Sequence, residues 1–107
     1  MYYTTGIGQA AGTIVSGTTT VTTSGTAVRI TATSTPIAGV WVGGDIGNAG
    51  VVLVGDVNVS ATSGTQQGMI IGPAESSKFL AINDLNKLWV DADEDGDEIV
   101  WLYLQPE

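Results

Sequence analysis

The chain contains no cysteine and no histidine. Without cysteine it can form no disulfide, use no thiolate nucleophile and offer no sulfur ligand to a metal. Without histidine it lacks the usual zinc ligand and the side chain that most often moves protons near neutral pH. These absences exclude most catalytic arrangements, so we expect no enzymatic activity, no catalytic residue and no bound cofactor.

Basic residues are also scarce. Three lysines and arginines stand against eleven aspartates and glutamates, which gives a net charge of −8. Nucleic acids and anionic membranes are bound by clustered Lys and Arg side chains that displace counterions. We therefore expect neither nucleic acid nor a membrane as a partner.

Long apolar runs are missing as well. No stretch approaches the roughly 18 residues that can span a bilayer. The first six residues, MYYTTG, have neither the basic segment nor the apolar segment of an export signal. We expect a protein that is made in the cytoplasm without a signal peptide.

Short β-branched runs, separated by Gly, Asn, Asp or Pro every several residues, make up most of the chain. This pattern predicts an all-β fold, an antiparallel, jelly-roll-like β-sandwich, as a single domain over residues 18–107. The run at 51–54 is apolar at every position and predicts a central strand covered on both faces. Asp84 is expected to cap a single helical turn at 84–87. The predicted strands are 18–23, 26–33, 37–42, 51–54, 57–61, 69–71, 78–82, 87–91 and 98–104.

Residues 1–17 contain four glycines among Ala and Thr and have too little side-chain bulk for a core. We interpret them as an extended N-terminal arm for attachment and oligomer contacts. The arm either contacts a neighbouring subunit or packs along its own domain. Its apolar and aromatic side chains are the candidate partner-binding residues: Tyr2, Tyr3, Ile7, Ile14 and Val15.

The acidic segment 91–98 opens like a calcium loop, with candidate ligands Asp91, Asp93, Asp95 and Asp97. The twelfth position of such a loop needs a bidentate Glu and here holds Leu102. The favoured interpretation is a solvated acidic hairpin that joins the last two strands and turns at Gly96.

Five aromatic residues lie within β runs and are interpreted as core rather than as a ligand platform. They are Trp41, Phe79, Trp89, Trp101 and Tyr103.

Five segments resemble, in their order and spacing, small structural proteins of tailed-bacteriophage virions, of the head decoration, cement or head-fibre type. They are TVTTSGTAV at 20–28, VGDVNVSA at 54–61, GPAES at 72–76, DLNKLWVD at 84–91 and DGD at 95–97.

The resemblance implies a non-enzymatic virion protein that decorates or cements the capsid surface and stabilises the head. It implies the major capsid protein as a partner and a homo-oligomer, such as a trimer, bound through the arm and the sandwich edges. An alternative is a tail- or fibre-associated adhesion module that binds host-surface glycan or protein through loops 43–50 and 62–68.

Overall fold

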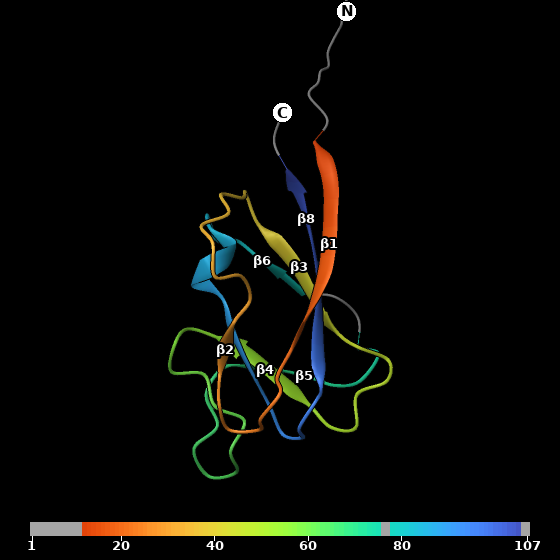
Figure 1. Ribbon diagram of the computed structural model, residues 1–107, viewed down its shortest axis with the longest axis vertical. Helices are drawn as coiled ribbons and strands as arrows, with labels where there is room; N and C mark the ends of the chain where they lie inside the picture. Colours follow the sequence, from red (N-terminus) through yellow and green to blue (C-terminus); the bar gives the residue numbers. More distant parts are fainter. Residues whose placement is uncertain (1–11, 76–77, 106–107) are drawn as a thin grey trace, which may run out of the picture.

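The structure is a computed structural model that describes residues 12–75 and 78–105, and it confirms the predicted all-β sandwich (Figure 1). Within these residues, eight strands and one 3₁₀ turn follow one another. They are β1 (Thr13–Thr20), β2 (Val28–Arg29), β3 (Val40–Gly44), β4 (Val52–Gly55), β5 (Met69–Ile71), β6 (Lys78–Leu80), η1 (Leu85–Lys87), β7 (Trp89–Ala92) and β8 (Glu98–Gln105).

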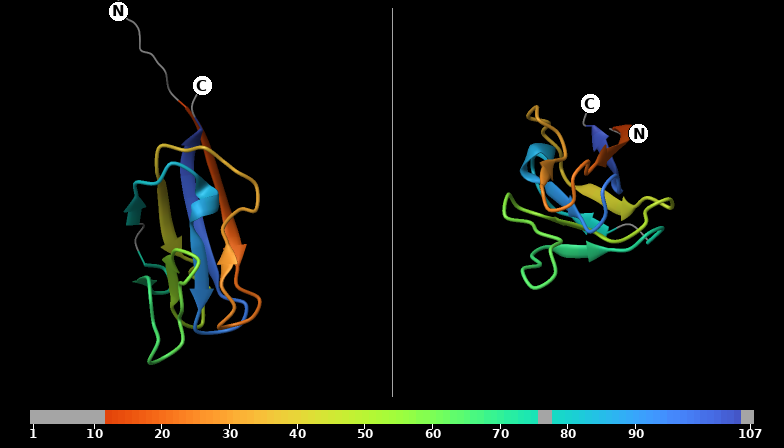
Figure 2. Two further views of the ribbon diagram at one scale, coloured as in Figure 1. Left: turned by 90° about the vertical axis from the view of Figure 1, so that its left-hand side faces the viewer. Right: turned by 60° about the horizontal axis from the view of Figure 1, so that its bottom comes forward.

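The strands form two four-stranded antiparallel sheets. The first sheet has the order β1-β8-β3-β6 and the second has the order β2-β7-β4-β5. This alternation of strands between two sheets is that of an eight-stranded jelly roll. Figure 2 shows the two sheets packed against each other, with the start of β1 and the end of β8 at one end of the sandwich.

The core lies between the two sheets and is built by alternation along each strand. Val40 and Val42 from the first sheet meet Val52, Val54 and Val90 from the second, and all five are buried. The residues between them on the same strands point to the outer faces. The side chains on the outer face of the first sheet therefore differ from those on the outer face of the second.

The prediction that residues 51–54 form a strand covered on both faces is confirmed for β4. Val52 and Val54 point into the core, whereas Leu53 points outward and is also fully buried. Val59 and Ala61, from the connection after β4, cover Leu53 from outside. The residues after β4 thus form a second, smaller apolar cluster on the outside of the second sheet.

The expected boundary between arm and sandwich, after residue 17, is wrong, because β1 begins at Thr13. All eight residues of β1 pair with β8, from Thr13 opposite Gln105 to Thr20 opposite Glu98. Gly17 belongs to this strand for a packing reason: a Cβ atom there would lie 2.6 Å from an indole carbon of Trp101. Residues 1–11 lie outside the described residues.

Three other expectations about strands are also wrong. Residues 57–61 form a turn-rich connection, with a single bridge between Ser60 and Gln67. The expected strand 26–33 shortens to β2. The last two strands do not form a hairpin, because β7 belongs to the second sheet and β8 to the first, so the acidic segment crosses between sheets. Val90 and Ile99 consequently enter the core from opposite sides.

The predicted cap at Asp84 is confirmed. Its carboxylate accepts hydrogen bonds from the Ser34 hydroxyl, from the Thr35 amide at 2.8 Å and from the Asn86 amide at 3.0 Å at the start of η1. These donors, the Ser34 hydroxyl most strongly, lower the pKa of Asp84 below its ordinary value of 3.8. The ionised carboxylate thereby joins the segment after β2 to η1.

The pKa of the Asp84 carboxyl is lower in the folded protein than in the unfolded chain. At a pH above the unfolded-state pKa, the ionised carboxylate therefore stabilises the fold. This stabilisation is lost as the pH falls through the folded-state pKa. We expect Asp84→Ala to lower the melting temperature at pH 7. The difference from the unmodified protein should begin to shrink near pH 3.8 and should go on shrinking at lower pH. Melting curves from pH 7 to pH 2 measure this difference. A difference that stays constant over that range would contradict the role of the ionised form.

Candidate protein-binding face

The predicted contact residues do not share one surface. Tyr2, Tyr3 and Ile7 lie outside the described residues. Ile14 and Val15 are neighbours in β1 and point to opposite sides of the first sheet. Ile14 is exposed on the outer side, whereas Val15 is half-buried and packs against the core. Of the two described candidates, only Ile14 is placed to meet a partner.

The outer side of the first sheet carries a continuous set of apolar side chains. The strand register places Ile14 opposite Leu104, and places Trp41 between Leu102 on β8 and Phe79 on β6. We call this set the outer apolar face. Its members are Ile14, Trp41, Phe79, Val100, Leu102 and Leu104.

Much of the outer apolar face is open to solvent. Ile14 is 65% exposed, Phe79 51%, Leu104 46% and Trp41 39%. The rings of Trp41 and Phe79 lie against each other, with centroids 4.7 Å apart and planes tilted by 53°. One open hollow lies beside these two rings and Leu104, and another runs from Trp41 across β8 to β1. Exposed apolar sets of this kind mark interaction surfaces.

Charge is confined to one end of this side of the sheet. Among the described residues, the only charged side chain that points outward from the first sheet is Glu98, whose carboxylate accepts from the Thr20 hydroxyl at 2.7 Å. Lys78 precedes Phe79 in β6 but points to the other side and pairs with Glu75 at 2.8 Å. A partner can therefore cover the outer apolar face without burying an unpaired charge.

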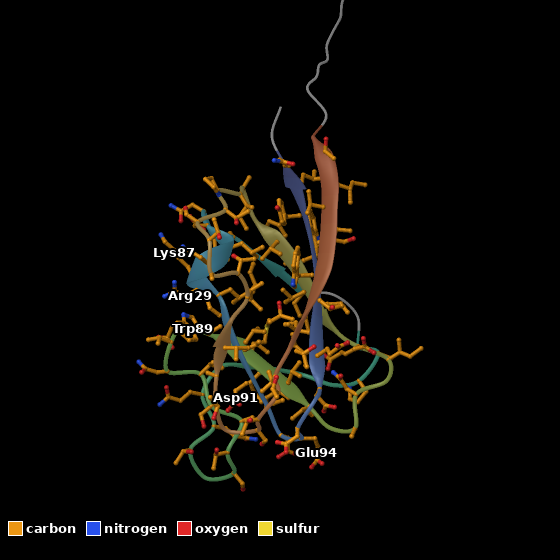
Figure 3. The ribbon with its side chains drawn as sticks, viewed as in Figure 1. Arg29, Lys87, Trp89, Asp91 and Glu94 are labelled. Carbon is orange, nitrogen blue, oxygen red and sulfur yellow. The ribbon has the colours of Figure 1, made fainter. Side chains whose placement is uncertain are left out.

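The outer side of the second sheet differs, because its two central strands are covered, while Ile70 on the edge strand β5 is 51% exposed. Leu53 is sealed by Val59 and Ala61, and the Arg29 guanidinium lies over the Trp89 ring, 5.0 Å from its centroid. Figure 3 shows Arg29 and Trp89 side by side. The described residues thus cover the middle of one outer face and leave the other face open.

The expectation that the aromatic residues form core holds for part of the set. Tyr103 is buried in the core, and Trp101 packs against the same core and stacks on Tyr103, with ring centroids 6.0 Å apart. The Trp101 indole N–H also donates to the Thr19 hydroxyl at 3.1 Å. For Trp41 and Phe79 the expectation is wrong, since both point outward from the first sheet.

The four candidate calcium ligands do not converge. Asp91 accepts from the amides of Gly25, Ala61 and Ala92 at 2.8–3.0 Å, and Asp97 accepts from residues 49 and 50 at 2.9 and 2.8 Å. Asp95 accepts from the Ser24 amide at 2.7 Å, and Asp93 is exposed. Within residues 12–75 and 78–105, no group of three or more acidic side chains is placed to hold a metal ion.

Two of these carboxylates hold loops in place. Asp91 is 1% exposed and Asp97 is 5% exposed, and most of their partners are backbone amides of distant loops. The sequence carried a signal for the first of these roles. Asp91 stands between Val90 and Ala92 in a strand, where a carboxylate needs buried donors.

We expect Asp91→Ala to lower the free energy of unfolding by about 3 kcal/mol, because three amides lose a charged acceptor and two of them, those of Ala61 and Ala92, are left buried. Asp93→Ala changes an exposed carboxylate two residues away and should change stability by about 0.5 kcal/mol or less. Urea unfolding of both variants checks the pair. Equal effects would show that Asp91 does not hold the loops.

Within the part of the chain that the structure describes, no helix has the length and apolar character needed to cross a membrane. Comparison of the chain with protein-family models, with curated protein sequences and with solved structures finds no match.

Proposed function

We propose that the chain is a non-enzymatic structural protein of a tailed-bacteriophage virion, which binds the capsid surface and stabilises the head. The observation that carries the proposal is the outer apolar face, an open and uncharged set of side chains on a protein with a net charge of −8. The resemblance of the five sequence segments to virion proteins supplies the partner, the major capsid protein. The fold alone does not decide the function, since jelly rolls serve many.

The energetics of the outer apolar face suit a partner that offers many identical sites. Ile14, Trp41, Phe79 and Leu104 already bury part of their surface within the sheet. Covering the remainder contributes on the order of 1 kcal/mol per side chain. One such contact gives only modest affinity, because binding also costs the translational and rotational freedom of the two partners. A capsid presents the same site repeatedly, so many copies bind one particle and each adds its own contact between capsid subunits.

The non-enzymatic part of the proposal is supported by the composition and by the state of the acidic residues. Asp84, Asp91 and Asp97 are engaged with backbone amides. A pair of carboxyl groups that works as acid and base needs two distinct environments facing one substrate. These three carboxylates instead face different loops.

The adhesion alternative uses loops 43–50 and 62–68, at the end of the sandwich away from the start of β1 and the end of β8 (Figure 1). One observation favours it: Ile46, within loop 43–50, is 83% exposed. Counting fluorescently labelled copies on intact particles separates the two functions. Capsid decoration predicts many copies spread over the head, and an adhesion module predicts a few at the tail.

Phe79→Glu should weaken binding to purified phage heads assembled without the protein by at least about tenfold, because a carboxylate would be buried in an apolar contact. Ile70→Glu is the matched control. Both residues are 51% exposed and both are the middle residue of a three-residue edge strand, but Ile70 lies on the second sheet. Cosedimentation with heads measures both variants. Equal binding by the two would remove the outer apolar face from the interface.

The contribution of the N-terminal residues is tested by deleting residues 2–11. This deletion leaves β1 whole, whereas a deletion of residues 2–17 would also remove five residues that pair with β8. We expect weaker binding to heads, because Tyr2, Tyr3 and Ile7 are lost, and an unchanged melting temperature. Full binding by the shortened protein would show that these three side chains are not contact residues.

A further inference from the structure

The four edge strands of the sandwich are not equally protected against pairing with another chain. An edge strand exposes a row of backbone N–H and C=O groups, and proteins shield it by shortness, by charge or by covering it. Three of the edges here follow this rule. β2 has two residues and carries Arg29, β6 has three residues and carries Lys78, and β5 has three residues.

The fourth edge, β1, has none of these protections. It is eight residues long and contains neither a charged residue nor a proline. Its pairing with β8 runs through all eight residues in one unbroken register. Within the described residues, no strand pairs with its other edge, and only the Thr19 hydroxyl reaches across to a neighbour, the Ile30 carbonyl, at 3.1 Å. Figure 1 shows β1 at the margin of the first sheet.

We propose that β1 pairs with β1 of a second copy of this chain, antiparallel and across a twofold axis. In such a contact the same strand serves both partners, so one uncharged edge provides both halves of the interface. The pairing joins two four-stranded first sheets into one sheet of eight strands.

The distribution of charge favours a second copy as the occupant. Each copy has a net charge of −8, and like charges directly opposite in paired strands are destabilising. None of the eleven acidic residues lies in β1. The neighbouring strand β8 contains one acidic residue, Glu98, which lies opposite Thr20 at the end of β1. Two copies can therefore meet along Thr13–Thr19 without placing carboxylates opposite each other. A basic partner strand, by contrast, would find no acidic side chain along this edge.

The side chains of β1 suit such a pairing. Thr, Ile and Val make up six of its eight residues, and β-branched residues favour strands. Ile14, Ser16 and Thr18 alternate on the outer side and would face their counterparts across the axis. The inference does not depend on the proposed capsid partner, because the isolated protein can be tested.

Sedimentation equilibrium of the full chain should give twice the chain mass of 10.9 kDa. The double variant Ser16→Glu with Thr18→Glu places carboxylates opposite each other and should raise the dissociation constant of the dimer by at least about tenfold. Ser63→Glu with Gln66→Glu adds the same charge to exposed positions of the loop before β5 and should leave the dimer unchanged. Circular dichroism spectra confirm that each variant is folded.

Because the chain has no cysteine, a single introduced cysteine reports the contact directly. The residue nearest a twofold axis faces its own copy at a Cβ separation of roughly 4.5–5.5 Å, close enough for a disulfide after a small shift. We expect a disulfide-linked dimer at one of Ile14→Cys, Ser16→Cys and Thr18→Cys, and none at Ser63→Cys.

Three results would overturn the inference. The first is a monomeric full chain at all concentrations. The second is a dimer that both the β1 charges and the deletion of residues 2–11 leave intact. The third is a dimer that disappears when residues 2–11 are removed but resists those charges, which would assign the contact to the N-terminal residues. A dimer that survives this deletion and dissociates with Ser16→Glu and Thr18→Glu supports pairing through β1.

Discussion

The carboxylate of Asp91 is the contact on which the difference between the two outer faces depends. It lies on the outer side of the second sheet and accepts three backbone amides, two of them, Gly25 and Ala61, from distant loops. Buried amides without an acceptor cost free energy comparable to a lost hydrogen bond each. With the carboxylate in place, the connection after β4 lies flat, and Val59 and Ala61 seal Leu53. A polar group therefore fixes an apolar layer, which hydrophobic burial alone would leave free to pack in many ways.

The first sheet has no equivalent covering among the described residues, and its outer apolar face stays open. Trp41 and Phe79 touch each other there, but large parts of both remain exposed. Such a surface favours non-specific association, which a net charge far from zero opposes. Eight of the eleven acidic residues lie in connections between strands, at Asp45, Asp56, Glu75, Asp84, Asp93, Glu94, Asp95 and Asp97, and Asp91 lies in the second sheet. This distribution is compatible with the proposed function, because charge on the loops opposes non-specific association while one sheet keeps an apolar surface for a partner.

The sequence predicted those strands whose burial shows in the residues next to each other along the chain. The apolar runs at 98–104 and 51–54 predicted β8 and β4, because burial of a strand leaves its mark on neighbouring residues. The segment 57–61 alternates, yet it is a connection, because its conformation is set by Asp91, thirty residues further along the chain. Alternation along β3 shows that the Trp41 side chain points to the opposite side of the sheet from Val40 and Val42. It does not show which of the two sides faces the core. The partner sheet decides that, so the open face could not be found from sequence.

Pairing through β1 would change what the outer apolar face can do. A twofold axis between antiparallel strands is perpendicular to the sheet, so the two outer apolar faces of a pair lie on the same side. Two weak faces held together bind a repeated surface far more tightly than either alone, because the second contact forms at high effective concentration. The same geometry bears on the oligomer number. Each β1 edge can pair only once, so a self-paired edge closes as a dimer, and a trimer would have to use a different, head-to-tail contact. The unprotected edge therefore favours twofold symmetry over the threefold symmetry that the resemblance allows.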